Sequence, residues 1–408
     1  MDCRTEDQTI LKICLEQDRS SSERMAEISA ALENVSEQRL PRCITILGTG
    51  EEFLTGEDSK GELRRVLDRL DQLRVPVILG INGRCSGMGM ELLRYADLAV
   101  ASGQAIIEGC RSPEEAEKSD VVNRTVPGQA LADTLEDYAM RLAAIPEPLI
   151  TFGHNLYFAL EKLPDRLARS QYGAGVIGDI MAIQAALNAD RPQQAALGKT
   201  EPQADGIQYR NDYDKTHAIL FEIRNNVEYI QLNAPQTHNM LDWRTSMELA
   251  GAYALANALP ELKAIVVTGV GRWFHLGGIR YCQEDAYERE RFADQLRLRN
   301  QIIREIHVPL ISAVNGECSG GGMSLVLKSD RVIAAEDALF GYPEVKHNGF
   351  ACNSMVNTMD IIPKKAALNM FYFGELFSAR KAKRYGIVHE IVSREELGEA
   401  VQRALSDL

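Results

Sequence analysis

The pattern of apolar residues predicts a buried strand, a glycine turn and a helix in succession within the second half of the chain. A mostly apolar run, Leu310–Val314, ends at the turn signal Asn315-Gly316. Such a run is typical of a strand that is buried on both faces. Gly320–Gly322 follow, and then a helix-compatible pattern, Met323–Lys328. The sequence therefore predicts a strand, a close turn and a helix that begins at glycines.

Glycines at the start of a helix point to a site for negative charge. The first N–H groups of a helix have no partner within it, they lie at its positive end, and glycine lets another molecule approach them closely. Two nucleotide-binding motifs do not fit the run. After Gly316, the pair Gly320-Gly321 is not followed by the lysine of a P-loop, and Leu325 stands where a dinucleotide fingerprint requires glycine. We therefore expect a site that stabilises an oxyanion.

The same pattern occurs a second time, nearer the N-terminus. Val75–Ser102 aligns without gaps on Val308–Ala335, and 13 of 28 positions are identical at an offset of 233. The loop before this stretch aligns at an offset of 221, and Ser112–Leu131 aligns on Ser378–Leu397 at an offset of 266. The increase of the offset from 233 to 266 means that the first copy lacks 33 residues. These include the second copy's segment around Glu344.

The repeat predicts an α/β chain made of two similar halves. We expect a first half over residues 1–187, a polar linker over 188–212 and a second half over 213–408. Helical patterns cover Ala130–Leu187, which has no counterpart at the end of the second half. We expect this segment to pack on the second half, or on another subunit, and to help close the site around Glu344.

Composition narrows the function classes. The 408 residues carry a net charge of −13, with an isoelectric point near 5.2, which argues against broad binding of nucleic acid or anionic membrane. Neither a signal peptide nor a membrane span is recognisable, so we expect a cytoplasmic protein. The eight cysteines form no CxxC pair, so neither a zinc site nor a disulfide framework is predicted, and no metal site is expected.

The motifs together resemble the crotonase, or enoyl-CoA hydratase/isomerase, superfamily. The resemblance rests on the glycine run with Asp330, on Phe340–Lys346, and on Val266–Gly269 followed by Gly271–Gly278. It implies the ClpP/crotonase-like spiral of ββα repeats, here as two fused copies with the first degenerate. It also implies an acyl thioester substrate carried on coenzyme A or an acyl carrier protein, no further cofactor, and a homo-oligomer built on trimers.

The resemblance places the catalytic groups in the second half. The backbone N–H groups of Gly278 and Gly321 would hold the thioester oxygen, and Glu344 would exchange protons with carbon. Family hydratases use two glutamates, but Ser324 stands at the other position, while the first half keeps only Glu91. We expect enoyl thioester isomerisation or hydration/dehydration. A single carboxylate disfavours simple water addition; decarboxylation, carbon–carbon cleavage or hydrolysis, and a non-catalytic scaffold stay open.

Other residues are candidates for contact with substrate, each beside a plainer alternative. Lys346 and His347 could bind a substrate carboxylate or form a solvated loop. His275 could line the pantetheine tunnel or be a satisfied core histidine. Gly277 belongs to the loop that would face the substrate. Tyr342 and Tyr281 could reach the substrate or pack in the core. The acyl group itself stays open.

Overall fold

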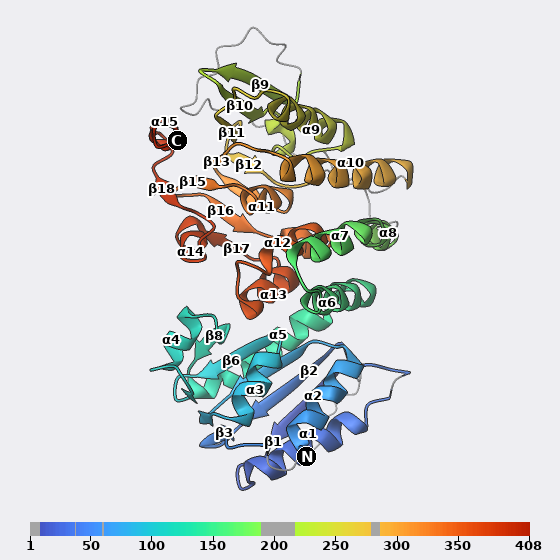
Figure 1. Ribbon diagram of the computed structural model, residues 1–408. Coiled ribbons are helices and arrows are strands. Elements are labelled where there is room, and N and C mark those ends of the chain that lie inside the picture. The colour runs from blue at the N-terminus through green and yellow to red at the C-terminus, as the bar shows by residue number, and fades with distance from the viewer. Residues whose placement is uncertain (1–8, 37, 59–60, 189–216, 279–285) are drawn as a thin grey trace. The chain divides into compact units, whose positions relative to one another are not determined.

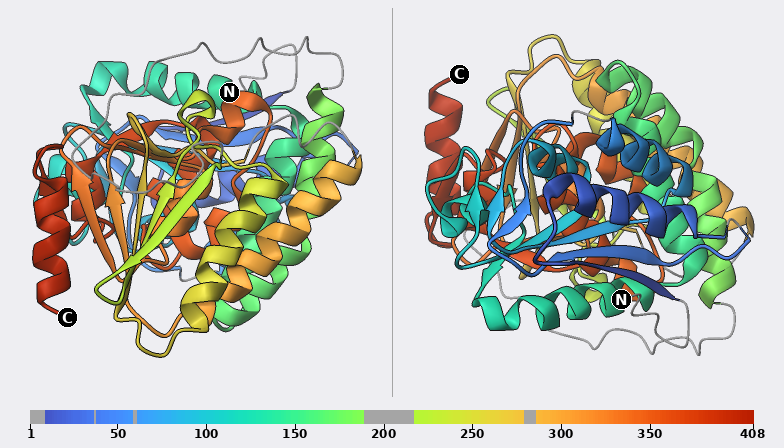
Figure 2. Two further views of the ribbon diagram at one scale, coloured as in Figure 1. Left: turned by 90° about the horizontal axis from the view of Figure 1, so that it is seen from above. Right: turned by 90° about the horizontal axis from the view of Figure 1, so that it is seen from below.

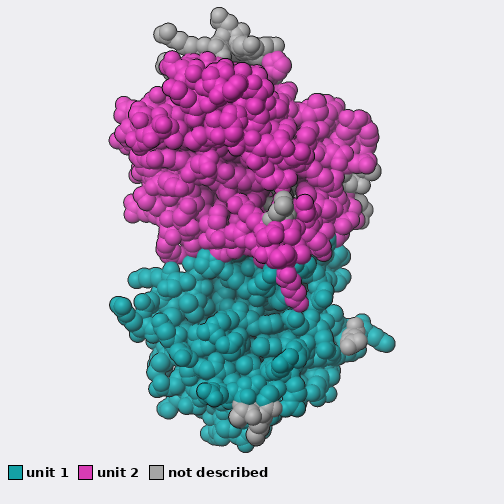
Figure 3. Space-filling view, in the orientation of Figure 1, with its two compact units in different colours: residues 1–161, 363–373 teal, residues 162–362, 374–408 magenta. Residues whose placement is uncertain are grey.

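The computed structural model describes residues 9–36, 38–58, 61–188, 217–278 and 286–408, and it divides the chain into two compact units. Unit 1 comprises residues 1–161 and 363–373, and unit 2 comprises residues 162–362 and 374–408 (Figures 1 and 3). Each unit contains parallel strands alternating with helices, so the predicted α/β class is confirmed. The expected linker, 188–212, lies outside the described residues except for its first.

Unit 1 is built on a sheet of five parallel strands in the order β1-β2-β4-β6-β8. These strands are Ile10–Leu15, Cys43–Gly48, Val77–Ile81, Leu98–Ser102 and Arg124–Val126. A small second sheet has the order β3-β5-β7, formed by Glu52–Leu54, Arg84–Cys85 and Ile106–Ile107. The helices are α1 (Ser21–Glu33), α2 (Glu62–Leu73), α3 (Met88–Tyr95), α4 (Pro113–Lys118), α5 (Leu131–Ala143), α6 (Glu147–Glu161) and α13 (Lys364–Phe373).

Unit 2 has a six-stranded sheet in the order β18-β15-β13-β11-β10-β9, parallel except for the edge hairpin of β9 and β10. In chain order these strands are Ile219–Arg224, Val227–Leu232, Ala264–Gly269, Leu310–Val314, Arg331–Ala335 and Glu390–Val392. The second sheet has the order β12-β14-β16-β17, formed by Trp273–His275, Glu317–Ser319, Leu339–Gly341 and Leu376–Ser378. Apolar side chains of the central strands β11, β13 and β15 are almost fully buried, as the sequence pattern predicts for Leu310–Val314, whereas Phe221 and Ile223 of the edge strand β9 are exposed.

The helices of unit 2 include two that precede the linker. They are α7 (Arg166–Gly175), α8 (Ile177–Asn188), α9 (Trp243–Asn257), α10 (Ala286–Arg304), α11 (Gly321–Val326), α12 (Cys352–Thr358), α14 (Ala379–Arg384) and α15 (Leu397–Ser406), with a 3-10 turn at Pro343–His347. Helices α9 and α10 lie side by side, and α8 packs against α10 (Figure 2).

The compact units differ from the expected domains at two places. Helices α7 and α8 fall in unit 2, because Arg169 pairs with Asp360 and Arg166 donates to Asn357 at 3.1 Å. Conversely, α13 falls in unit 1, because the Lys365 ammonium donates to backbone carbonyls at the end of α3. Polar contacts made by helix side chains, which a sequence repeat does not specify, account for both differences.

The two units share the order and the register of their parallel strands. Ile44 pairs with Val77 in unit 1, and Ile265 pairs with Leu310 in unit 2. These pairs are related by the same offsets, 221 and 233, that the sequence alignment requires. The pairings of β4 with β6, β6 with β8, β3 with β5 and β5 with β7 correspond to unit 2 pairings in the same way. The sequence repeat therefore corresponds to a repeat of backbone hydrogen bonding.

The same hydrogen bond, buried in unit 1 and partly buried in unit 2, explains an identical aspartate in the two copies. The Val77 N–H donates to Oδ2 of Asp97 at 2.7 Å, and the Leu310 N–H donates to Oδ2 of Asp330 at 2.8 Å. Both donors lie at or beside the start of a central strand, where no strand partner takes the N–H. A carboxylate satisfies this donor at the same point of each sheet.

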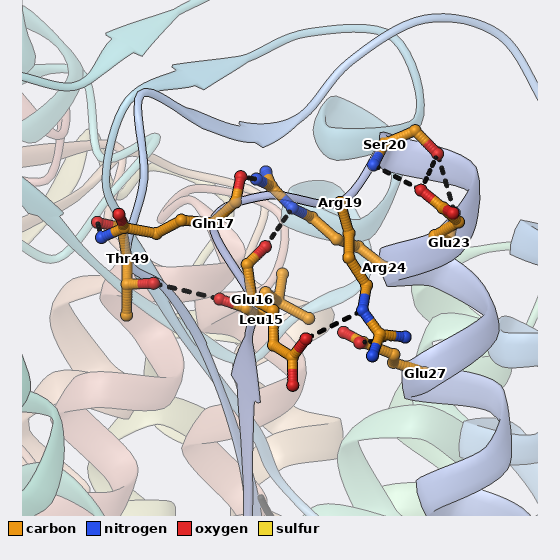
Figure 4. A network of polar contacts seen from close by, with 9 residues as sticks. All are labelled: Leu15, Glu16, Gln17, Arg19, Ser20, Glu23, Arg24, Glu27 and Thr49. Atoms are coloured by element: carbon orange, nitrogen blue, oxygen red, sulfur yellow. Dashed lines mark hydrogen bonds and ion pairs between the residues drawn. The ribbon is translucent and has the colours of Figure 1, made fainter.

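In unit 1, a buried arginine fixes the loops around the first strand. Arg24 donates to the carbonyls of Glu16 and Gln17 at 3.0 and 2.7 Å (Figure 4). It also donates to the carbonyls of Glu52 and Phe53 on β3. One side chain thereby satisfies carbonyls of the loop after β1 and of β3 inside the unit. The guanidinium acts as a structural clamp in unit 1.

Candidate active site

Unit 2 contains a cavity of about 400 Å³ between the glycine turn, α8 and α10. The residues that line it come from separate parts of the unit and are mostly apolar or backbone groups. They are Ile177, Ile180, Met181, Gln184, His238, Met240, Leu241, His275, Leu276, Gly277, Gly278, Phe292, Leu296, Arg299, Glu317, Ser319, Gly321, Pro343, Glu344, His347, Phe350, Ala351, Cys352 and Ser354. Such a volume, with few polar groups, is typical of a small-molecule site.

Two loops meet at the cavity so closely that glycine is required. A Cβ on Gly277 would lie 3.1 Å from the backbone N of Gly321, and a Cβ on Gly322 would lie 2.2 Å from the carbonyl oxygen of His275. Gly277 has a φ of +99°, in the region that favours glycine. Because Gly321 is the first residue of α11, its N–H has no acceptor within the helix. The structure thus brings Gly278 and Gly321, the expected oxyanion donors, to one cavity.

The carboxyl group of Glu344 lies against this glycine turn. The residue is half-buried, and its Oε2 is buried with no hydrogen-bond partner among the described residues. Burial raises the pKa of Glu344 to about 7, opposed by a hydrogen bond from its own backbone N–H. A carboxyl with this pKa can both take up and release a proton near neutrality.

His275 lies in the cavity wall as a neutral imidazole. Its Nδ1 is 2.8 Å from the carbonyl oxygen of Asn239, an acceptor only, and 3.3 Å from the backbone N of Gly277; the shorter contact places the proton on Nδ1. Burial, and after it the charge of Arg299, lowers the pKa of His275 to about 3. The imidazole is therefore a fixed polar wall and not a proton donor at neutral pH.

Of the other residues predicted to bind substrate, some line the cavity and others do not. His347 and Gly277 line the cavity. Tyr342 does not: it is fully buried in the core, where its hydroxyl bonds Thr358. Lys346 is exposed and is also absent from the lining. Successive side chains along a 3-10 turn point in different directions. Tyr342 and Lys346, each two residues from Glu344, therefore do not share its cavity. Tyr281 lies outside the described residues.

A second carboxylate lines the cavity, which sequence reasoning missed. Glu317 on β14 is half-buried, and its Oε1 accepts from the Ser319 hydroxyl at 3.3 Å. Burial raises the pKa of Glu317, while Ser319 and the nearby charge of Lys346 lower it. The expectation of one carboxylate at the site is therefore wrong: Glu317 comes from a strand, not from the helix position where Ser324 stands.

A buried cation, Arg299 of α10, also lines the cavity and was not predicted. It lies within residues 284–306, a stretch of mixed charged and apolar residues whose pattern predicts an amphipathic helix. Only the packing of α10 beside α9 buries this one arginine.

Helix α8 covers part of the cavity with apolar side chains. The cavity is lined by four residues of this helix: Ile177, Ile180, Met181 and Gln184. The side chain of Gln184 packs against Gly349, where an added Cβ would lie 2.8 Å from the Nε2 of Gln184. The expectation that the helices after the first half's repeat help to close the site is confirmed for α8. Helices α5 and α6, from the same predicted segment, belong to unit 1.

The equivalent place in unit 1 is closed. The N–H of Met88, at the position of Gly321, donates to the carbonyl of Gly56 at 2.8 Å. Glu91 is exposed and pairs with Arg94. An anion could not bind the Met88 N–H without breaking this hydrogen bond.

Comparison with known proteins places unit 2 in a described family. The sequence profile described as enoyl-CoA hydratase/isomerase matches residues 222–408. The chain is 31% identical to an (E)-benzylidenesuccinyl-CoA hydratase of Thauera aromatica over 44% of this chain and 72% of that protein. It is 31% identical to a carnitinyl-CoA dehydratase of Salmonella typhi over 44% of this chain and 69% of that one. A solved enoyl-CoA hydratase subunit from Geobacillus kaustophilus is 28% identical, covers 48% of this chain and 76% of its own, and has a TM-score of 0.45.

Within the described residues, no helix has the length and apolar character to cross a membrane.

Proposed function

We propose that this chain, which belongs to the enoyl-CoA hydratase/isomerase family, is an enzyme whose unit 2 moves a proton within an acyl thioester. The observation that carries the proposal is the carboxyl of Glu344, with a buried, unpartnered Oε2, beside the turn of Gly320 and Gly321. The reactions that this arrangement supports best are double-bond isomerisation and hydration or dehydration of an enoyl thioester.

In this proposal the thioester oxygen accepts hydrogen bonds from the N–H groups of Gly278 and Gly321. Negative charge grows on that oxygen when a neighbouring carbon loses a proton. Preorganised donors in a site that excludes water stabilise such a charge, and one donor is worth about 2.7–4 kcal/mol. The close packing of Gly277 against Gly321 keeps both loops fixed, so little reorganisation is needed during the reaction.

Glu344 then acts as the proton carrier. Its carboxylate removes a proton from the carbon α or γ to the thioester carbonyl, and the electron pair passes to the oxygen as an enolate. The protonated carboxyl returns the proton to the other carbon, which completes an isomerisation without any other reactant. A pKa near 7 suits both steps, because neither protonation state is strongly favoured at neutral pH.

Glu317 favours water addition or removal as a second reaction at the same site. Two carboxyl groups, Glu344 and Glu317, line the cavity, and both have raised pKa values caused first by burial. One carboxylate accepts a proton from water as the water oxygen bonds to the β-carbon and the double-bond electrons form the enolate, and the other carboxyl group protonates the α-carbon. The water's oxygen and proton are then both accounted for.

We assign no turnover to unit 1, which we regard as a degenerate second copy of the same fold. Its repeated strand register supports a common origin, and the hydrogen bond from Met88 to Gly56 supports a closed site. The substrate carrier is coenzyme A or a phosphopantetheine arm. A trimer-based homo-oligomer, which the family resemblance implies, and a cytoplasmic location, which the sequence analysis expects, remain predictions.

The test is to incubate the full chain with a panel of 2-enoyl, 3-enoyl and 3-hydroxyacyl coenzyme A thioesters in ¹⁸O-labelled water. Mass spectrometry of the products separates the reactions: isomerisation leaves the mass unchanged, whereas hydration adds one labelled water. Conversion of any panel member supports the proposal. Binding of the thioesters without conversion, and without exchange of their α-protons, contradicts it and favours a scaffold.

A further inference from the structure

Arg299 is a buried cation with no carboxylate partner in the part of the chain that the structure describes. Its side chain lies on α10, and the residue is 5% exposed. Its one hydrogen bond is from Nη1 to the Ser246 hydroxyl at 3.3 Å, and it forms no ion pair with any described residue. Burial of a guanidinium without an opposite charge costs several kcal/mol, so an anion that reaches it gains strongly.

A small recess shows where this charge lies relative to the proposed reaction centre. The recess, about 10 Å³, is lined by Tyr253, Ser324 and Lys328, and it shares His275, Arg299 and Gly321 with the main cavity. Neither Glu317 nor Glu344 lines it. Arg299 therefore lines both the recess and the main cavity, together with Gly321 and His275.

The other groups around the recess add positive charge or none. Lys328 is half-buried and donates to Asn300, and burial, followed by the charges of neighbouring arginines, lowers its pKa to about 7. His275 is neutral, as shown above. Burial raises the pKa of Tyr253, so its phenol stays protonated, and its hydroxyl is buried with no hydrogen-bond partner among the described residues. Glu228 raises the Tyr253 pKa through its charge but makes no ion pair with Arg299.

We propose that the substrate of this site is an acyl thioester whose acyl group carries a second carboxylate, and that Arg299 binds this carboxylate. The proposal rests on the function proposed above, because it takes Gly321 as a donor to the thioester oxygen. A guanidinium pairs with a carboxylate through two parallel N–H···O bonds, and the cavity of about 400 Å³ that Arg299 lines has room for such a planar anion.

The position of the recess identifies which part of the substrate carries the charge. The phosphates of coenzyme A are separated from the thioester by the whole length of the pantetheine arm. A recess bounded by Gly321 therefore meets the acyl portion and not the nucleotide. Ser246, with its neutral hydroxyl, holds the guanidinium without neutralising it, so the charge stays available to the acyl group.

The test uses binding, so that it does not depend on turnover. Calorimetry compares succinyl-, glutaryl- and adipyl-CoA, each with the straight-chain acyl-CoA that ends in methyl at the same chain length. We expect the chain to prefer at least one carboxylate-ended member of a pair. Arg299→Met should reduce binding of that member by about 10²–10³-fold, the usual cost of removing one partner of a buried charge pair. The preference should thereby disappear.

Two further variants keep the test interpretable. Arg297→Met removes a half-exposed arginine from the same helix, paired with Asp294, and should leave the preference unchanged. Arg299→Lys retains the charge without the forked geometry and should give an intermediate preference, which decides the case if Arg299→Met fails to fold. Equal binding of all pairs by the unaltered chain, or a preference that survives both Arg299 changes, overturns the proposal. A carboxylate preference without conversion of any thioester supports the Arg299 site and contradicts the proposed function alone.

Discussion

The carboxyl group of Glu344 lies so close to Gly320 that a Cβ on the glycine would be 2.6 Å from its Oε1. Gly320 also has a φ of +54°, a conformation that side chains rarely adopt. The contact therefore links the start of α11, with its N–H donors, to the acid that we propose as the proton carrier. A side chain at position 320 would push the carboxyl group of Glu344 away from the start of α11.

Replacing Gly320 by alanine should accordingly abolish most activity. We expect a loss on the order of 10²-fold or more in turnover, because small misplacements of reacting groups cost about that much. The matched control is Gly251→Ala in α9, where nothing lies within 4 Å of the new Cβ and the backbone is helical. The control should retain activity and be slightly stabilised. Steady-state kinetics with thermal melts distinguish a damaged site from a damaged fold, and normal turnover by Gly320→Ala would refute the contact's importance.

The raised pKa of Glu344 predicts a specific dependence of stability on pH. The folded chain holds this proton up to about pH 7, whereas the unfolded chain releases it near 4.5. This contribution to stability is present below pH 4.5 and is lost as pH rises through 7. Glu344→Gln should therefore raise the melting temperature relative to the unaltered chain at pH 8 more than at pH 5. Equal differences at the two pH values would show that the Glu344 pKa is not raised.

Activity should depend on pH through the same group in the opposite sense. Proton removal from carbon requires the ionised carboxylate, so kcat/KM for isomerisation should increase with pH and level off above about pH 7. The pH profile of kcat/KM measures this directly. A profile that is flat between pH 5.5 and 8.5 would exclude a group with this pKa from the rate-determining proton transfer.

Glu317 should matter for water addition and not for exchange of protons at carbon. Glu317→Gln preserves the shape of the side chain but cannot accept a proton, so hydration should slow by about 10²-fold or more. Exchange of α-protons, which requires Glu344 alone in our account, should continue. The comparison needs one variant and two assays, labelled-water incorporation and α-proton exchange. Equal losses in both would mean that Glu317 supports Glu344 and has no separate role.

Glu91 of unit 1 should be dispensable. Its side chain is exposed and paired with Arg94, and the Met88 N–H beside it already has a partner in Gly56. We expect Glu91→Gln to leave turnover nearly intact, measured beside Glu344→Gln under the same conditions. A hundredfold loss without unfolding would assign catalysis to unit 1 instead of unit 2.

The strand framework could be predicted from sequence because it depends on local patterns. Apolar runs, turn signals and the identical spacing of Asn82 and Asn315 gave offsets that match the register of the sheets. The glycine turn at Gly320–Gly322 was equally accessible, since only glycine fits two backbones in contact. These features are specified within short stretches of chain.

Side chains brought together by tertiary packing could not be predicted in this way. Arg299 reads as one of several charges on a polar helix, and only its packing beside α9 buries it. The direction of the Glu317 side chain depends on how β14 pairs with β12 in the second sheet. Tyr342 lies in the core although it is only two residues from Glu344. The grouping of α13 with unit 1 depends on Lys365, a residue with no recognisable motif.

The central claim is that Glu344 exchanges protons with a carbon next to the thioester carbonyl. Its most direct measurement is exchange of substrate α-protons in deuterium oxide, followed by NMR or mass spectrometry, for the unaltered chain and for Glu344→Gln. We predict rapid exchange by the unaltered chain and a loss of about 10²–10⁴-fold in the variant, with thioester binding largely preserved. Undiminished exchange by Glu344→Gln would contradict the account and would assign the proton transfer to another group of the cavity, with His347 the next to test.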